Sequence, residues 1–395
     1  MNLDYIIRPQ KYVQQELFGK EYTEYYSTEN LLFFDTFIRW QFNENLLFYV
    51  SKDFSCLLVS GFGVKLSKKS ERLQIKENNK VMFEIPFFKL NTVAIFSKGV
   101  GLSSDLLEEF IKNNINLSFH DYSGKPYALL NPINATNNTI LKRKQLNIKD
   151  SVEESNLIIK IISGKISNQI SLLKYITKNI KANNEQNILK LNATKNAIEQ
   201  MNNNIEKILT LEKNMADIEE TKTKIMGYEG TCARIYWETI SVLLKNKIDF
   251  FGREHKMPTD IVNTLLNYGY GILYSQIWKA IVLSGLDPYI GLLHTENKGK
   301  PSLVFDLIEE FRAPVVDRTV ISFIMSNKKI KVEQGFISLE TRQKFSNKIL
   351  YRLETKEQFM GGKYKISDII LLQARNIVNY ILQESKNYKS FSFKW

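Results

Sequence analysis

The sequence predicts an α+β protein in which a small antiparallel β domain precedes a larger all-α domain. Three observations predict this order. Short apolar runs separated by turn residues recur over residues 55–132, a linker with an Asn- and Thr-rich start follows at 133–145, and apolar residues at helical spacing dominate 146–395. Residues 1–54 are rich in Tyr and Phe and carry no readable motif. We therefore treat them as an N-terminal extension of unknown role.

The apolar runs of the β domain predict its strands. Each run is short and is bounded by residues that favour turns, as expected for antiparallel strands joined by hairpins. The stretch Ser103–Asp105 is placed to cap a short amphipathic helix that ends near Ile111. A further strand is expected at 115–119. The earlier strands are expected at 57–59, 64–66, 73–75, 81–85 and 93–96.

The part after the linker is expected to be helical throughout. Ile198, Met201, Ile205 and Ile208 are spaced by 3, 4 and 3 residues, which places them on one face of a helix. Long helices are also expected at 151–180, 229–247, 259–284, 303–312 and 365–385.

The composition favours a basic protein that binds polyanions. Of 395 residues, 44% are hydrophobic and 12% aromatic, enough for packed cores in two domains. Lys and Arg total 54 against 42 Asp and Glu, and the resulting net charge of +12 predisposes the chain to nucleic acid. The alternative is that a composition rich in Lys, Asn and Ile reflects an AT-rich genome.

Cysteine usage and the lack of long apolar runs favour a cytoplasmic location. Cys56 and Cys232 have no metal-ligand spacing and fall in different predicted domains, so we expect no disulfide. No apolar run approaches the ~20 residues of a membrane-spanning helix. The stretch Met1–Arg8 lacks the basic flank and apolar core of a secretory signal. We expect a cytoplasmic protein without a membrane partner.

A glutamate and a histidine are placed to bind a metal in the helical domain. Glu229 is expected to open a helix between Gly227 and Gly230, which allow close approach of a ligand. The alternative is a carboxylate that only complements the helix dipole. His294 follows the apolar Gly291–Leu293 at the start of a polar loop, a good place for a ligand. The alternative is a structural histidine.

Two carboxylates share one face of the helix expected at 303–312. Asp306 and Glu309 are separated by three residues, and such a pair needs a cation or a proton to offset its repulsion. The alternative is a solvated face with Arg312 as counter-ion. His294 lies 15 residues before Glu309, so a loop and a helical turn can bring them together. Two carboxylates and an imidazole suit Mg²⁺ or Mn²⁺, which can assist phosphodiester chemistry.

The remaining histidines are weaker candidates. His120, beside Asp121, is expected to be structural, and His255 lies among charged residues near a possible phosphate contact. No phosphate-binding Gly loop, Ser nucleophile elbow or Cys-based zinc site is present in the sequence.

In order along the chain, these segments resemble the CRISPR-associated integrase/endonuclease family, Cas1. The resemblance covers about residues 56–390 and is specific because every short motif stands in its expected place. It rests on Leu57–Gly61, Ile115–Pro126, Lys165–Gln169, Glu229–Trp237, Phe250–Tyr270, His294 and Asp306–Arg312.

The resemblance implies that Glu229, His294 and Glu309 bind a divalent metal, with Asp306 in support. It implies a β domain followed by an α domain, and a homodimer that assembles around a Cas2 dimer. The implied reaction joins 3′ hydroxyls of a short double-stranded DNA fragment, the spacer precursor, to the CRISPR repeat by transesterification. On this reading Arg234, Arg253 and Lys298 are candidates for DNA-backbone contacts, although Arg234 fits a helix-packing ion pair equally well.

Two features depart from the family pattern, and two other functions compete with it. Residues 1–55 precede the usual start, and the helical region 181–226 is longer than usual. The alternatives are a transposon-encoded integrase of the same family and a non-catalytic DNA-binding assembly subunit. A third alternative is a free-standing nuclease that uses water in place of a 3′ hydroxyl.

Overall fold

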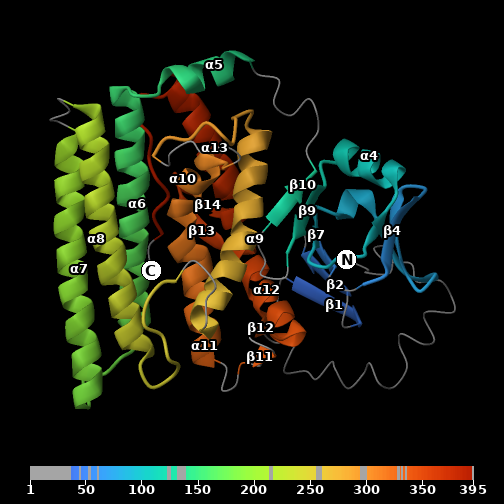
Figure 1. Ribbon diagram of the computed structural model, residues 1–395, viewed down its shortest axis with the longest axis horizontal. Helices are drawn as coiled ribbons and strands as arrows, with labels where there is room; N and C mark the ends of the chain where they lie inside the picture. Colours follow the sequence, from blue (N-terminus) through green and yellow to red (C-terminus); the bar gives the residue numbers. More distant parts are fainter. Residues whose placement is uncertain are drawn as a thin grey trace. The chain divides into compact units, whose positions relative to one another are not determined.

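The computed structural model divides into two compact units, Met1–Pro132 and Ile133–Trp395 (Figure 1). The predicted order of a sheet region followed by a helical unit is confirmed. The structure describes residues 37–43, 46–51, 55–59, 62–121, 126–130, 139–212, 217–254, 260–293, 300–326, 330, 332–333 and 336–393.

The first unit contains two sheets that meet around one apolar core. The six-stranded sheet has the order β1 (Phe37–Asn43), β2 (Leu46–Ser51), β3 (Ser55–Val59), β7 (Thr92–Ile95), β9 (Asn116–His120) and β10 (Pro126–Leu129). The four-stranded sheet has the order β6 (Lys80–Pro86), β5 (Arg72–Glu77), β4 (Val64–Lys69) and β8 (Gly101–Leu102).

The sheets contain the predicted antiparallel pairs and, beside them, parallel pairs that the sequence did not predict. Strand β3 runs parallel to β7, β7 parallel to β9, and β4 parallel to β8. The reason is that the β4–β5–β6 segment lies between β3 and β7 in the sequence, and helix α4 (Ser104–Lys112) lies between β7 and β9. Such crossovers return the chain in the same direction, which produces parallel neighbours.

The six-stranded sheet also begins earlier than residue 55. Strands β1 and β2 pair with each other and then with β3, so they belong to the same sheet. The core between the sheets and α4 is built from alternating apolar residues, and Phe87 from the short helix η2 (Phe87–Lys89) meets Phe110 of α4 edge to face at 6.3 Å.

The second unit is a set of packed helices with two small hairpins. Helices α6 and α8 each pack on α7, and the three stand side by side (Figure 1). No helix among the described residues is long and apolar enough to cross a membrane. The elements are α5 (Thr139–Asn147), α6 (Val152–Thr177), α7 (Glu185–Leu211), α8 (Ile218–Leu244), α9 (Ile261–Leu283), α10 (Ser302–Phe311), η4 (Arg312–Asp317), α11 (Arg318–Ser326), β11 (Val332–Glu333), β12 (Phe336–Ile337), α12 (Leu339–Glu354), β13 (Lys356–Phe359), β14 (Gly362–Lys365) and α13 (Ile366–Ile381).

The apolar spacing located the expected long helices, but the hairpins β11–β12 and β13–β14 interrupt a part that the sequence predicts to be helical throughout, and two boundaries also differ. Helix α8 begins at Ile218 and not at Glu229, because Asp217 caps it by accepting from the Glu220 amide at 3.1 Å. Helix α5 occupies part of the segment 133–145, for which the sequence predicts a linker. It packs through buried Leu141 and Gln145.

The C-terminal residues 388–393 are held against α6 and α10. The side-chain amide of Asn168 donates to the carbonyls of Glu310 and Phe391 at 2.8 and 2.9 Å, and its oxygen accepts from the Phe393 amide at 3.1 Å. Glu310 is fully buried, and burial raises the pKa of its carboxyl to about 7. Residues 388–393 therefore link α6 to α10 through Asn168 and Glu310.

Replacing Glu310 by alanine is expected to lower the free energy of unfolding by about 3 kcal/mol or more. Two buried donors, the Tyr388 hydroxyl and the Phe391 amide, would lose their acceptor, and Gln373 would lose one of its three acceptors; each unsatisfied donor costs about 1–3 kcal/mol. The donors are Gln373 Nε2 at 2.6 Å, the Tyr388 hydroxyl at 2.6 Å and the Phe391 amide at 2.8 Å. Urea denaturation measures the change. The exposed Glu199→Ala variant is the control, and equal stability of the two variants would contradict the prediction.

Candidate metal centre

Two carboxylates from different helices meet on one ammonium group. Lys165 of α6 places its Nζ 2.5 Å from Glu229 Oε1 of α8 and 2.7 Å from Glu309 Oε2 of α10. The Glu309 side chain is 6% exposed, Lys165 14% and Glu229 25%, so the group is largely removed from water but retains an opening at Glu229. The structure therefore brings together two of the three ligands that the resemblance implies.

A second cation contacts Glu309 from the following turn. Arg312 Nε lies 3.2 Å from Glu309 Oε1. Arg312 opens η4, a π-helical turn that interrupts the α-helix between α10 and α11. A π turn inserts an extra residue and shifts the side chains after it around the helix axis, and such turns are frequent at functional sites.

A buried network continues from Arg312 away from the carboxylate pair. The Arg312 guanidinium lies 4.8 Å from the centre of the Tyr270 ring, and the Arg253 guanidinium lies 5.4 Å from it. The Tyr270 hydroxyl donates to Asp317 Oδ1 at 2.5 Å, and the Tyr236 hydroxyl donates to Asp317 Oδ2 at 2.9 Å. Helices α8 and α9 are thereby fixed to the end of η4.

Arg253 is held in place by side-chain amides of α9. Its Nη1 donates to Asn263 Oδ1 at 2.9 Å and its Nη2 to Asn267 Oδ1 at 2.6 Å. Asp260 caps α9 and accepts from Asn263 Nδ2 at 2.6 Å. Arg253, which the sequence offers as a DNA contact, therefore makes its hydrogen bonds within the protein and is only partly exposed.

The pKa shifts follow from the charges in this cluster. Burial acts to lower the pKa of Lys165, but Glu309 and Glu229 outweigh it and raise that pKa above its ordinary value. Burial also acts to lower the pKa of Arg312, and Glu309 again reverses the effect. Burial raises the pKa of Asp317 in spite of the two tyrosine hydroxyls that it accepts from. Lys165 and Arg312 therefore stay charged at neutral pH.

Asp306 ties the loop before His294 to α10. Its Oδ2 accepts from the Leu292 amide at 2.6 Å. A Cβ atom on Gly291 would lie 2.3 Å from Ser302 Cβ and 3.2 Å from Asp306 Oδ2, so only glycine allows this approach. Residues 294–299, which include His294 and Lys298, lie outside the described residues. Asp306 thus supports the loop that leads to His294.

The other predicted residues lie elsewhere. Arg234 is exposed and pairs with Glu238 one turn later at 3.1 Å. His120 is buried, stacks on Phe96 at 4.4 Å and lies 2.9 Å from Ser118 Oγ, as a structural histidine would. His255 is not among the described residues. Within the described part of the chain, no three His, Cys, Asp or Glu side chains are grouped closely enough to form a metal site.

The donor set at Glu229 and Glu309 fits a divalent cation. The Lys165 ammonium touches one oxygen of each carboxylate, which shows that both oxygens face a common point suited to a positive charge. Carboxylate oxygens are the ligands that Mg²⁺ and Mn²⁺ prefer. Cys232 lies one turn after Glu229, but burial raises the pKa of its thiol to about 11, so it would be protonated and a poor ligand.

Sequence reasoning missed Lys165 as a member of this site. The motif Lys165–Gln169 signalled the family resemblance, and two of its polar residues have separate roles: Lys165 contacts the carboxylates, and Asn168 holds residues 388–393. A lysine within the apolar run of α6, which buries Ile161, Ile162 and Ile166, is the signal that was available. A charged residue so placed needs a buried partner.

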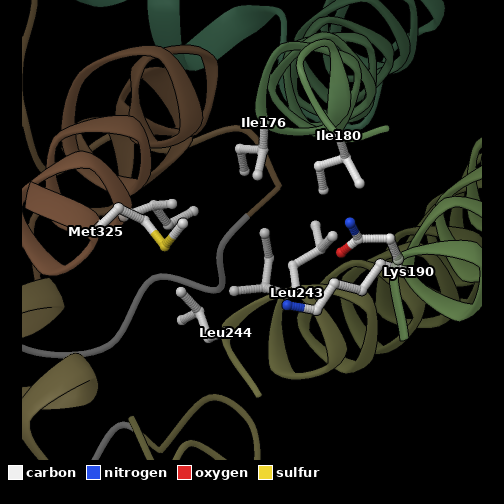
Figure 2. A pocket seen from close by; sticks show the side chains of 9 residues that line it. Ile176, Ile180, Lys190, Leu243, Leu244 and Met325 are labelled. Atoms are coloured by element: carbon white, nitrogen blue, oxygen red, sulfur yellow. The ribbon is translucent and has the colours of Figure 1, made fainter. Parts of the chain in front are cut away.

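A separate pocket of about 180 Å³ lies between α6, α7, α8 and α11 (Figure 2). Its lining is mostly apolar, with Met325 and Lys190 on opposite sides of it (Figure 2). Burial lowers the pKa of Lys190. A mostly apolar lining does not suit a phosphate chain, so this pocket is not where phosphodiester chemistry would occur. The lining residues are Ile176, Ile180, Asn187, Lys190, Ile240, Leu243, Leu244, Ile321 and Met325.

The chain matches a known family and several curated proteins. The sequence profile of the family described as CRISPR associated protein Cas1 matches residues 57–352. The chain is 35% identical over 351 residues to the CRISPR-associated protein Cas1 3 of Methanobrevibacter ruminantium, covering 86% of this chain and 99% of that protein. It is 32% identical over 353 residues to the CRISPR-associated endonuclease Cas1 1 of Archaeoglobus fulgidus, with the same coverage of each.

Solved structures share the fold. A casposase bound to its integration product superimposes with a TM-score of 0.69 at 23% identity, covering 85% of this chain and 92% of that chain. A chain of a Cas6-RT-Cas1–Cas2 complex superimposes with a TM-score of 0.68 at 18% identity, covering 87% of this chain and 36% of that much longer chain. At these identities the likeness concerns the fold alone.

Proposed function

Because the chain belongs to the CRISPR-associated Cas1 family, we propose that it is a divalent-metal-dependent DNA integrase/endonuclease of CRISPR adaptation. Its reaction would join the 3′-OH ends of short DNA fragments, the spacers, to the CRISPR repeat by transesterification. The single observation that carries the proposal is the convergence of Glu229 and Glu309 on one cationic point at 2.5 and 2.7 Å.

In this proposal Glu229, His294 and Glu309 hold Mg²⁺ or Mn²⁺, and Asp306 supports the site by holding the Leu292 amide, two residues before His294. When bound, such a cation activates a hydroxyl nucleophile and stabilises the negative charge that develops on the phosphate and leaving oxygen. Arg312 orients the Glu309 carboxylate through its 3.2 Å contact. Lys165 lies within the same cluster and adds a positive charge beside any phosphate that reaches the carboxylates.

The proposed partners follow from the family and the charge. A net charge of +12 favours double-stranded DNA, both the spacer precursor and the repeat. One structural neighbour is named as a complex that contains Cas1 and Cas2, and we propose a homodimer that assembles with a Cas2 dimer here as well. We place the protein in the cytoplasm. Arg234, which is exposed, and Lys298 remain proposed backbone contacts, and Arg253 would have to leave its amide partners to reach DNA.

An integration assay tests the function directly. The purified protein is incubated with a labelled spacer precursor and a supercoiled plasmid that carries the cognate repeat, with and without Cas2. We expect strand joining with Mg²⁺ or Mn²⁺ and none after EDTA treatment, while DNA binding persists. Joining that continues in EDTA would refute metal dependence. Binding without joining in any metal would favour the non-catalytic assembly subunit.

The second candidate function is a transposon-encoded integrase, for which the fold likeness to the casposase is the specific observation. Its substrate would be the ends of its own element. The curated relatives at 32–35% identity are CRISPR-associated proteins, which favours the first function. Offering both substrates in one assay separates the two: preference for terminal inverted repeats over a CRISPR repeat would select the transposon function.

A further inference from the structure

The ammonium of Lys165 occupies the space between the two carboxylates proposed as metal ligands. It approaches one oxygen of Glu229 and one of Glu309, at 2.5 and 2.7 Å, and so joins three helices at one point. All three side chains are at least three-quarters buried. Two carboxylates held this close and this far from water repel each other strongly unless a cation lies between them.

The charges of the cluster cancel with Lys165 in place. Glu229 and Glu309 contribute two negative charges, and Lys165 and Arg312 contribute two positive ones, so these four groups sum to zero. A neutral cluster attracts a divalent cation weakly, and a cation entering between the carboxylates would also meet the Lys165 ammonium. If the ammonium withdraws, the remaining three groups carry one net negative charge at the point where the cation binds.

The lysine side chain is suited to such a withdrawal. Its charge sits at the end of a flexible four-carbon stem, whereas the guanidinium of Arg312 is a rigid fork that is also packed on Tyr270 at 4.8 Å. Of the two cations at Glu309, Lys165 is therefore the one that can move without disturbing the buried network behind it.

Building on the proposed function, we propose that Lys165 is the resident counter-cation of the ligand pair and competes with the divalent metal for it. Without metal, Lys165 holds Glu229 and Glu309 together and prevents their repulsion from separating α8 and α10. When metal binds, it displaces the ammonium from at least one carboxylate oxygen. Lys165 thus lowers the affinity for metal, but it also keeps Glu229 and Glu309 in position before the metal binds.

The test is the affinity for Mn²⁺, measured by isothermal titration calorimetry on the full chain without DNA. Lys165→Met removes the competing charge and should tighten Mn²⁺ binding on the order of tenfold, within the usual range of coupling between two ligands. The melting temperature of the metal-free variant should fall below that of the wild type, and saturating Mn²⁺ should raise it by a larger amount. Lys165→Arg retains the charge and should keep the weaker affinity.

Matched variants keep the outcome interpretable. Lys160→Met removes a lysine of the same helix that pairs with Glu212 at 2.6 Å, and it should leave the Mn²⁺ affinity unchanged. If Lys165→Met does not fold, Lys165→Gln removes the charge and retains a hydrogen-bond donor, and the same tightening is expected. Mn²⁺ binding by the neutral variant that equals or falls below the wild-type affinity would overturn the competition.

Failure of the proposed function gives a different result. If Glu229 and Glu309 are not metal ligands, the wild type and every Lys165 variant show no Mn²⁺ binding that depends on Glu229, and no strand joining occurs with any metal. Wild-type binding that is lost in Glu229→Gln, together with unchanged affinity in Lys165→Met, would instead leave the metal site intact and refute only the role of Lys165.

Discussion

Replacing Glu229 by glutamine is expected to reduce strand joining on the order of 1,000-fold or more, because it removes a proposed metal ligand and the charge it directs at the reaction centre. Glutamine has nearly the same shape as glutamate, so the packing of α8 should survive. The single remaining carboxylate, Glu309, would still be paired with Lys165 at 2.7 Å and Arg312 at 3.2 Å, which leaves the cluster with a net positive charge. A divalent cation would then find one carboxylate and two competing cations.

The measurement is the rate of joining of a labelled 3′-OH end to a repeat-containing plasmid, with DNA affinity followed in parallel. Glu238→Gln is the matched control, since Glu238 lies on the same helix, is exposed and pairs with Arg234. We expect the control to join strands at the wild-type rate and both variants to bind DNA. The His294→Ala variant should lose joining to a similar extent. Full integration by Glu229→Gln or by His294→Ala would contradict the proposed ligand set.

Local spacing in the sequence was enough to predict which helices carry the carboxylates. Asp306 and Glu309 lie three residues apart on α10, and the helix ends within one residue of its predicted limit. Helix periodicity is a local property, and the apolar positions report it directly. The start of α8 was misjudged because Gly227 and Gly230 resemble helix boundaries, whereas the helix runs through both of them.

Contacts between distant segments were beyond the reach of local patterns. Lys165 meets a glutamate 64 residues later, and a single lysine on an apolar helix does not specify which carboxylate will cover it. Asp317 was not predicted as a site residue at all, because its partners Tyr236 and Tyr270 come from two other helices. The parallel pairing of β3 with β7 was missed for the same reason, since a whole sheet segment separates them in sequence.

The buried network that packs on Arg312 connects the Asp317 carboxylate to the proposed metal site. Counting the ionic groups from Glu229 to Asp317 gives three negative and three positive charges: Glu229, Glu309 and Asp317 against Lys165, Arg312 and Arg253. Asp317 is 2% exposed and accepts from both tyrosine hydroxyls. It is the group that fixes the ring on which both guanidinium groups pack.

Replacing Asp317 by alanine is therefore expected to destabilise the protein by about 3–5 kcal/mol, as is usual when one partner of a buried charged network is removed. Two buried hydroxyls would lose their acceptor, and the cluster would carry one uncompensated positive charge. The free energy of unfolding from urea titration measures the effect, and Glu238→Ala, which breaks an exposed pair worth at most about 1 kcal/mol, provides the comparison.

The same variant separates support of the fold from support of the site. Asp317→Asn retains an acceptor for one hydroxyl and the volume of the side chain, so it should recover part of the stability while leaving the excess positive charge. If Asp317 acts on the site through Tyr270 and Arg312, the asparagine variant should still bind Mn²⁺ more weakly than the wild type, because the excess charge lies in the network that contacts Glu309. Wild-type Mn²⁺ affinity in a stably folded Asp317→Asn protein would confine Asp317 to a structural role and uncouple the network from the metal centre.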